Sequence, residues 1–311
     1  MGRYAVRRIL QMIPVFFGTT FLIFAMVYAT PGDPVQRLSG EKRPDPARAA
    51  FLRAEYNLND PLVVQYGKYM GKLATGDLGK TFNERPVTDL LQQQWPVSVK
   101  LTLTGLGIQA ILGLGLGLLA GLRRGGVVDK AVLFTTLLFV SFPAFVMAFV
   151  LQYFIGVQGR DVFHLPVAGT TQGWPVAYIL PGLTTALLGL AYSSRLTRTS
   201  IVENLRADYV RTAVAKGLPR RRVVGVHTLR NSLIPVITFL GTEVGTIFGT
   251  AIVTEQIFNL NGLGRQIASS ARAGEAPVVV GLVTLLVLVY VSATLVVDLL
   301  YGVLDPRIRY D

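Results

Sequence analysis

The stretch at residues 74–81, ATGDLGKT, nearly matches the nucleotide-binding P-loop, G-x-x-x-x-G-K-[ST]. In a P-loop, backbone N–H groups and the lysine hold the phosphates of a nucleotide, and the loop follows a strand. Here Ala74 stands at the position of the first glycine, and residues 63–73, VVQYGKYMGKL, have the apolar spacing of a helix. The sequence therefore predicts that this stretch does not bind ATP.

Isolated polar side chains elsewhere are the remaining candidates for chemistry. Glu243 falls inside an apolar segment, and a carboxylate within a membrane span is a candidate functional residue. It could line a polar pathway or pair with a polar neighbour at an interface between chains. Glu255 is a second candidate for the pathway, although its place near the end of a segment favours solvation. His164 and His227 lack neighbours at metal-ligand spacing, and the chain has no cysteine. We therefore predict no metal, bound cofactor or catalytic residue.

The composition indicates that these residues belong to a membrane protein. Of the 311 residues, 51% are apolar and 15% are charged, whereas a soluble domain carries about 25% charged residues. A membrane-spanning helix needs about 20 mostly apolar residues. Six such segments lie at residues 9–29, 101–122, 131–156, 177–194, 233–254 and 276–297. The first has no small-residue cleavage site, so it is predicted to be an uncleaved span. We predict an all-α polytopic membrane protein with six transmembrane helices.

The distribution of basic residues predicts the orientation of these spans. Residues 195–230 carry nine Lys/Arg and two acidic residues, and the turn at 123–130 and the tail at 305–311 are also basic. Residues 30–97 carry nine Lys/Arg against eight acidic residues. Basic loops stay in the cytoplasm. Both termini are therefore predicted to be cytoplasmic, and residues 30–97, with the P-loop-like stretch, are predicted to lie outside.

This topology divides the chain into four parts. We predict a lead helix at 1–29, an external helical subdomain at 30–97, a five-helix core at 98–304 with a cytoplasmic loop at 195–232, and a cytoplasmic tail at 305–311.

A row of glycines marks one face of the second span. Gly113, Gly117 and Gly121 recur every four residues, a spacing that lets two helix backbones approach closely in lipid. Static packing explains such a row more simply than a helix that slides against its neighbour.

The cytoplasmic loop is predicted to contain a short amphipathic helix. Asp208 is placed as its N-cap and Gly217 as the residue that ends it, which brackets roughly 9 residues. Its apolar face is predicted to continue an upstream stripe, made of Val202, Leu205, Tyr209 and Ala213. Such a helix lies on anionic lipid or inserts into a groove on a partner protein, and the sequence leaves both open.

Residues 208–238, DYVRTAVAKGLPRRRVVGVHTLRNSLIPVIT, resemble the cytoplasmic EAA loop of ABC-importer permeases in the form found in dipeptide and oligopeptide permeases. Arg211, Thr212 and Ala213 stand at the E-A-A positions, and Gly217 stands at the motif's glycine. The leading glutamate is absent, as in the RTA form that peptide permeases commonly show. Five further stretches are similar to the B-type subunit of that family, in order along nearly the whole chain: PGDPV, NLNDPLVVQY, GDLGKT, EQIFNLNGLG and VDLLYGVLDPRIR.

The resemblance implies a type I ABC-importer permease for dipeptides or oligopeptides, with nickel or glutathione as the alternative. The implied partners are a homologous second permease, two ATPase subunits that bind ATP and Mg²⁺, an external peptide-binding protein and membrane lipid, with no nucleic acid. The EAA helix would couple to an ATPase subunit. Its implied coupling residues are Asp208, Tyr209, Arg211, Thr212, Ala213, Lys216 and Gly217.

Two other classes of protein fit the residues less well. An intramembrane enzyme needs a convergent Ser/His set or paired aspartates within the spans, and the spans contain no histidine. A secondary transporter would show inverted repeats and interrupted helices in matching halves, and neither is apparent. The loop at 259–276 could dip into the pathway, contact the binding protein or form an ordinary lid.

Overall fold

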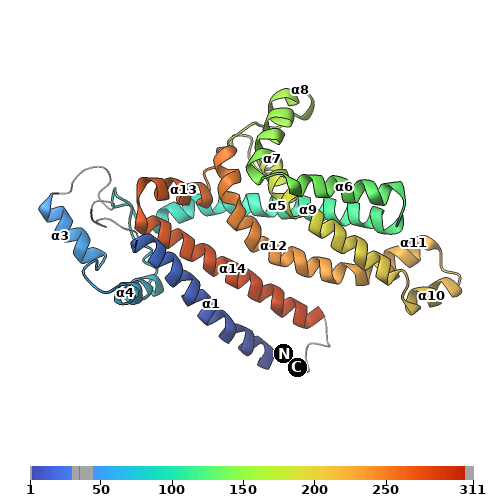
Figure 1. The fold of residues 1–311 in the computed structure, drawn as a ribbon, viewed down its shortest axis with the longest axis horizontal. Helices are drawn as coiled ribbons and strands as arrows, with labels where there is room; N and C mark the ends of the chain where they lie inside the picture. The colour runs from blue at the N-terminus through green and yellow to red at the C-terminus, as the bar shows by residue number, and fades with distance from the viewer. Residues whose placement is uncertain (1, 30–34, 36–44, 305–311) are drawn as a thin grey trace. The chain divides into compact units, whose positions relative to one another are not determined.

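The protein is built from helices, as the sequence predicts. The structure is a computed structural model that describes residues 2–29, 35 and 45–304 (Figure 1). Its helices, with η1 and η2 denoting π-helical segments, are α1 (Gly2–Tyr28), α3 (Pro46–Glu55), α4 (Leu62–Ala74), α5 (Val87–Leu122), α6 (Val127–Ser141), α7 (Ala144–Leu151), η1 (Gln152–Gln158), α8 (Arg160–Phe163), α9 (Val176–Asn204), α10 (Asp208–Ala215), α11 (Arg220–Arg222), η2 (Val223–Thr228), α12 (Leu229–Ile257), α13 (Leu263–Ala273) and α14 (Ala276–Leu304). The PGDPV stretch, apart from Val35, and the tail at 305–311 lie outside the described residues.

Five helical segments are long and apolar enough to cross a membrane. They are Tyr4–Tyr28, Val87–Leu122, Val176–Asn204, Arg220–Ile257 and Ala276–Leu299. They correspond to the first, second, fourth, fifth and sixth predicted spans. Their length and composition confirm those five predictions.

The third predicted span is a broken helix. α6 ends at Ser141, α7 begins at Ala144, and the segments on either side of the break are bent by 106°. Pro143 cannot donate a backbone hydrogen bond and disfavours the helical conformation of the residue before it, and Phe142 is accordingly extended, with ψ 138°. The expectation of one continuous helix over 131–156 is wrong. The chain has six spans when the bent pair is taken as one.

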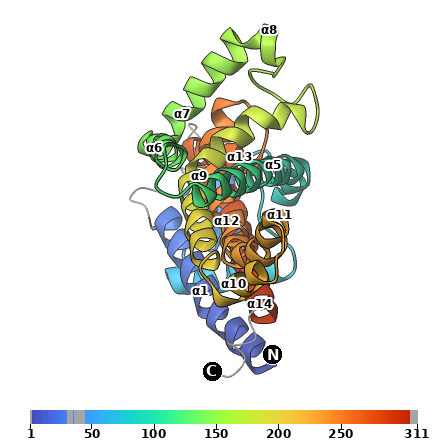
Figure 2. The same cartoon turned by 90° about the vertical axis from the view of Figure 1, so that its right-hand side faces the viewer.

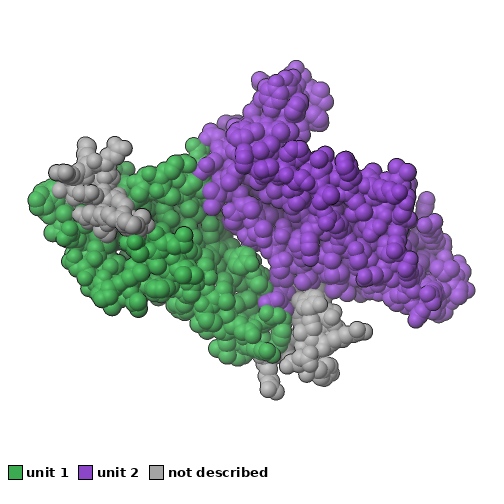
Figure 3. All heavy atoms as spheres, viewed as in Figure 1, with its two compact units in different colours: residues 1–98, 261–295 green, residues 99–260, 296–311 purple. Residues whose placement is uncertain are grey.

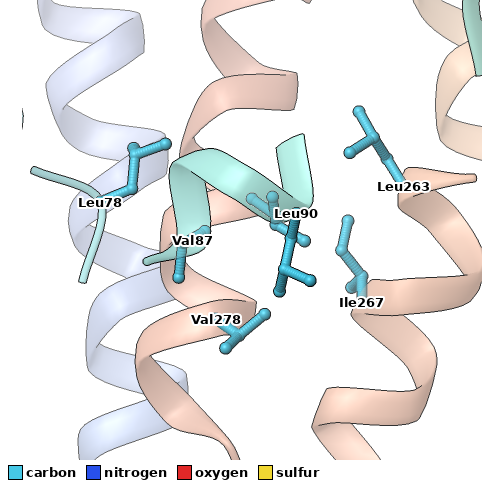
Figure 4. Close-up of a cluster of buried hydrophobic side chains, with 7 residues drawn as sticks. Leu78, Val87, Leu90, Leu263, Ile267 and Val278 are labelled. Carbon is cyan, nitrogen blue, oxygen red and sulfur yellow. The ribbon is translucent and has the colours of Figure 1, made fainter. Parts of the chain in front are cut away.

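The chain folds as two compact units (Figure 3). The first comprises residues 1–98 and 261–295, and the second comprises residues 99–260 and 296–311. The core of the first unit joins the beginning of α5 to α13 and α14, which are distant in sequence (Figure 4). Its buried members are Leu78, Val87, Leu90, Leu263, Ile267, Val278 and Leu282.

The loop at 259–276 forms a packed helix, α13, in the first unit. Gln266 on α13 accepts a hydrogen bond from Gln94 of α5 at 2.8 Å. Ser270 donates to Glu275 at 2.8 Å, and Glu275 in turn accepts from the backbone N–H of Phe82 at 3.2 Å. These hydrogen bonds fix α13 to two other segments of its own unit.

In the second unit, α5 and α9 approach closely along the glycine row. A Cβ at Gly113 would lie 2.3 Å from Oγ of Ser193, and a Cβ at Gly117 would lie 2.5 Å from the carbonyl oxygen of Ser194. Gly121 is covered by α9 in the same way. Contacts this short leave no room for a side chain larger than hydrogen, so the close approach of two helix backbones along the glycine row is confirmed.

α9 is the central helix of the second unit. It packs along α12 and also contacts α6 and α7 (Figures 1 and 2). In the most apolar stretch of α9, 72% of the residues are buried, compared with 33% in the most apolar stretch of α5. The unit is therefore arranged around α9, which runs directly into the connection that contains α10.

Candidate functional site

The connection between α9 and α12 lies within the predicted loop at 195–232, and much of that loop is helical. α9 continues to Asn204, and the helical segment that contains α12 begins at Arg220. Only residues 205–219 link these two segments, and α10 occupies eight of them. α9 has 29 residues, so it is about 43 Å long, whereas the hydrocarbon core of a bilayer is about 30 Å thick. α9 is therefore longer than the hydrocarbon core is thick, and its last residues lead into α10.

The two ends of α10 are built differently from each other. Asp208 is the first helical residue and Ala207 is the N-cap, so the prediction of Asp208 as N-cap is wrong. Asp208 instead places negative charge in the first turn, where it favours the helix dipole. At the other end Gly217 has φ 75°, and the N–H groups of Gly217 and Leu218 donate to carbonyl groups of α10 at 2.9 and 3.3 Å. This is a Schellman ending, so the prediction for Gly217 is confirmed.

One face of α10 packs against the protein itself. Val210 and Ala213 are buried with Val223 of η2, and Leu218 packs against them. Ala213 was expected on an outward face together with Tyr209. That expectation is wrong, because α9 ends before α10 begins and the predicted stripe is not on one continuous helix.

Other residues of α10 stay exposed beside this buried stripe. Val214 is 59% exposed, and Arg211, Thr212 and Lys216 are exposed with it. Tyr209, on the other flank of the stripe, is 40% exposed and donates a hydrogen bond to Asn204 of α9. An exposed valine beside charged side chains provides a small apolar contact with a polar rim, which suits docking to another molecule. Sequence reasoning missed Val214. The sequence clue to it was the apolar pair Val210 and Ala213, whose spacing defines the buried side of α10.

A largely buried ion pair lies near the connection between α9 and α12. Arg198 of α9 donates to both carboxylate oxygens of Asp129 on α6, at 2.5 and 2.7 Å, and the Gly125 N–H donates to the same carboxylate at 2.8 Å. Ser232 of α12 donates to the backbone carbonyl of Ser200 on α9 at 3.2 Å. α6, α9 and α12 are therefore joined to one another near the end of α9 that leads into α10.

Glu243 lies where α5, α9 and α12 meet. Its Oε2 is 3.5 Å from Nε2 of Gln109. Both side chains pass over Gly189, where a Cβ would lie 2.2 Å from Gln109 and 2.7 Å from Glu243. Gln109 is fully buried, and its Oε1 has no hydrogen-bond partner among the described residues. Sequence reasoning missed Gln109, whose signal was its place between Gly105 and Gly113 in the four-residue row of α5.

The exposed surfaces of the spans differ in chemistry. Around Glu243, which is half-buried, α12 exposes Thr242 and Thr246, and α9 exposes Tyr192 by 60%. The broken span exposes large apolar side chains instead, namely Phe134, Leu137, Leu138, Phe145 and Phe149. Lipid favours the second surface, whereas a polar surface inside a span faces water or another protein. The surface around Glu243 is therefore the candidate for a pathway or an interface.

Glu255 lies near the end of α12 and is 0% exposed. It interacts electrostatically with Tyr178, near the beginning of α9. Solvation was expected there, and this expectation is wrong because the end of α12 is packed inside the second unit. Since Glu255 has no exposed surface, it does not share the polar surface that Glu243 occupies.

The P-loop-like stretch has neither of the elements that a P-loop needs. It follows α4, which ends at Ala74, and not a strand, so the predicted helix is confirmed. Gly79 has φ 92°, and exposed Lys80 forms an isolated bridge with Pro86. α5 begins only at Val87, so no helix N-terminus stands at the lysine to receive phosphate groups. This geometry does not bind a nucleotide in the P-loop manner.

Comparison with known proteins gives a consistent result along the chain. The family model for the N-terminal part of binding-protein-dependent transport system membrane components matches residues 1–102. The model described as binding-protein-dependent transport system inner membrane component matches residues 113–310. Dipeptide transport system permease proteins of Alkalihalophilus pseudofirmus and Escherichia coli are 34% and 37% identical, over 100% of this chain and 100% and 99% of their own lengths. A glutathione transport system permease protein of Escherichia coli is 35% identical over 100% of both chains.

Proposed function

This chain belongs to the family of binding-protein-dependent transport system inner membrane components, and on this premise we propose that it is the permease subunit of an ATP-driven importer of dipeptides or longer peptides. The full-length likeness to dipeptide permeases carries the proposal. The fold is that of a type I ABC importer permease. The equally complete likeness to a glutathione permease makes glutathione, itself a small peptide, the second candidate substrate.

The proposed complex separates transport from ATP hydrolysis. This chain forms half of the pathway, and a homologous second permease forms the other half. Two ATPase subunits bind ATP and Mg²⁺, and an external binding protein delivers the peptide. The geometry of residues 74–81, which lacks the elements of a P-loop, supports an energy source in other chains.

In this proposal α10 is the coupling helix. Its exposed side, with Val214, Arg211 and Thr212, docks into a cleft of one ATPase subunit. Its inward face, with Val210 and Ala213, transmits movement to the rest of the connection. Closure of the ATPase subunits then rotates the permeases as rigid bodies between inward-open and outward-open states. The alternative for α10 is attachment to anionic lipid, which the experiment below distinguishes.

The polar surface around Glu243 is the proposed lining of the pathway. A peptide carries an ammonium group, which the half-buried carboxylate is placed to attract. Gln109 donates to that carboxylate from the buried side and Gly189 leaves room for both. The alternative is an interface with the second permease. Glu243→Gln is expected to reduce uptake of peptides with a free amino group while leaving the assembled complex intact.

The proposed location is the cell membrane, with both termini in the cytoplasm. In this cysteine-free chain, an impermeant thiol reagent is expected to label Lys80→Cys from outside and to leave Arg221→Cys unlabelled in intact cells. Lys42 is a third suitable position by sequence, but it lies outside the described residues. Labelling of Arg221→Cys from outside would reverse the orientation.

The coupling role is tested with a charge on the outward face of α10. Val214→Glu is expected to abolish ATP-driven uptake and to reduce recovery of the ATPase subunits with the permease, because the cleft cannot accommodate a carboxylate in an apolar contact. Val127→Glu is the matched control, since Val127 is also exposed, by 84%, at the beginning of α6. It is expected to leave both measurements unchanged.

The measurements are uptake of labelled dialanine and of glutathione into proteoliposomes that contain the complex and its external binding protein, and co-purification of the ATPase subunits. Full ATPase recovery with normal uptake in Val214→Glu would contradict the coupling role. Uptake of neither substrate by the unmodified complex would contradict the peptide importer.

A further inference from the structure

The helix α4 carries an exposed apolar face that the transport roles above do not use. Its exposed residues at helical spacing are Val63, Gly67, Gly71 and Ala74, with Val64 beside them. Val63 is 68% exposed. No charged residue interrupts this row. A helix that stood in water would be expected to place charged side chains on such a face.

The opposite side of α4 is fixed against α1. The hydroxyl of Tyr66 lies 2.7 Å from Oγ1 of Thr20 and donates to the carbonyl oxygen of Phe17 at 3.0 Å. The Tyr66 ring also packs on the rings of Phe21 and Phe24, with centroids 5.2 and 5.7 Å away. Thr20 is fully buried by these contacts. The position of α4 relative to α1 is therefore set by hydrogen bonds as well as by ring packing.

A second tyrosine extends this attachment. The ring of Tyr69 lies 5.5 Å from that of Phe24, and its hydroxyl donates to the carbonyl oxygen of Val280 on α14 at 3.4 Å. Burial raises the pKa of Tyr69 to about 12. The attached side of α4 is thus held by two helices of the first unit.

These contacts lie inside the first span and not beyond its end. The span ends at Tyr28, and Thr20 is eight residues earlier, which corresponds to about 12 Å along the helix. Figure 1 shows α4 beside the Tyr28 end of α1. The contacts of α4 therefore fall within the length of the first span, toward its Tyr28 end.

The charges on α4 are arranged as at such a boundary. Lys68 is paired with Asp60 at 2.5 Å, and Lys72 with Glu55 at 3.1 Å. Near the α4 contact, α1 exposes the apolar side chain of Leu22 by 63%, as the surface of a membrane span does toward lipid. An apolar face bordered by paired lysines is the pattern of a helix that lies in the plane of the membrane interface.

We propose that α4 is an interfacial helix, whose face of Val63, Val64, Gly67, Gly71 and Ala74 lies among the acyl chains at the Tyr28 end of the first span. Lys68 and Lys72 then lie at the level of the headgroups. The occupant of the exposed face is lipid. The aromatic contacts with α1 make α4 a part of the membrane-embedded body, not of a soluble loop. This inference is independent of the transported substrate and of the coupling role of α10.

The test uses single cysteines in this cysteine-free chain, within the assembled complex in vesicles of phosphatidylcholine and phosphatidylglycerol. Val63→Cys and Val64→Cys are labelled with bimane, and quenching by lipids with a nitroxide at a shallow acyl position is measured. Leu22→Cys is the lipid-facing reference, and Lys80→Cys, at an exposed position after α4, is the water-facing reference.

Quenching at Val63 and Val64 is expected to come within about two-fold of that at Leu22, with little at Lys80. Quenching as weak as that at Lys80 would overturn the proposal. If the two positions are then labelled by a charged thiol reagent as fast as Lys80→Cys, α4 faces water. If they are protected from that reagent, a protein covers the face. Because the cysteines replace exposed side chains without contacts to other elements, their effect on folding is small and is checked by recovery of the complex.

Discussion

The close approach of α5 and α9 makes a sharp prediction about two neighbouring glycines. A Cβ at Gly117 would lie 2.5 Å from the carbonyl oxygen of Ser194 and 2.5 Å from Cβ of Thr197, whereas a Cβ at Gly115 would meet nothing within 4 Å. Gly117→Ala and Gly115→Ala therefore make the same chemical change, two residues apart on one helix. They should act on stability in opposite directions.

The magnitude follows from the distances. Ordinary carbon contacts are about 3.5–4.0 Å, so alanine at Gly117 requires a shift of about 1 Å. The atom that must give way at Ser194 belongs to the main chain of α9 and cannot rotate away. Overpacking of this kind costs about 1–3 kcal/mol, and the separated helices also lose contacts along the rest of the glycine row. At Gly115 only the helix propensity changes, which favours alanine by up to about 1 kcal/mol.

The assay is thermal denaturation of each variant complex in the same detergent. Each kcal/mol corresponds to roughly 2–4 °C for a domain of 150–250 residues. Gly117→Ala is expected to lower the midpoint by several degrees, and Gly115→Ala to leave it unchanged or raise it. Equal midpoints for the two variants would refute the close packing of α5 on α9, and with it the reason for a glycine at Gly189 opposite Gln109.

Three other substitutions test the connection between α9 and α12, the ion pair near it and the P-loop-like stretch. Gly217→Val forces a β-branched residue into a left-handed conformation at a cost of about 1 kcal/mol or more. Gly225→Val is the control, because its side chain also enters open space but its φ is not positive. Uptake should fall only in Gly217→Val, and equal uptake in both variants would contradict a role for the Schellman ending. Lys80→Ala should leave the ATPase activity of the complex intact, and its loss would reinstate a nucleotide role for the stretch. Asp129→Asn leaves the Arg198 guanidinium without its carboxylate, which should lower the stability by about 3–5 kcal/mol. Adding Arg198→Met should restore part of the lost denaturation temperature. A double variant less stable than Asp129→Asn alone would count against the ion pair.

The membrane spans were predictable because each residue contributes independently to the length and mean apolarity of its segment. Length and mean apolarity decide whether a helix can cross a membrane, and neither requires knowledge of its neighbours. The glycine row and Gly217 were predictable for a similar reason, since backbone conformation and backbone proximity restrict the residue type locally. Each of these features is specified by a few positions within one element.

The break in the third span shows where this local reasoning fails. Pro14, Pro96, Pro181 and Pro235 all lie inside helices that continue past them. Pro143 alone among these five is the site of a 106° bend between described helices. A proline removes one hydrogen bond in every case, so the outcome depends on whether the packing around it holds the helix together. That packing depends on residues of other helices, which the sequence next to the proline does not reveal.

The direction in which a side chain points is the other property that required the fold. Ala213 and Val214 are adjacent and both apolar, yet Val210, Leu218 and Val223 bury the first and leave the second exposed. A charge at Ala213 would therefore break the internal packing of the connection and abolish coupling whether or not α10 docks into an ATPase subunit. A charge at Val214 leaves that packing in place and changes only the outward surface. Loss of uptake in Val214→Glu, with the permease still inserted and stable, thus reports on the partner contact, which loss in Ala213→Glu cannot do.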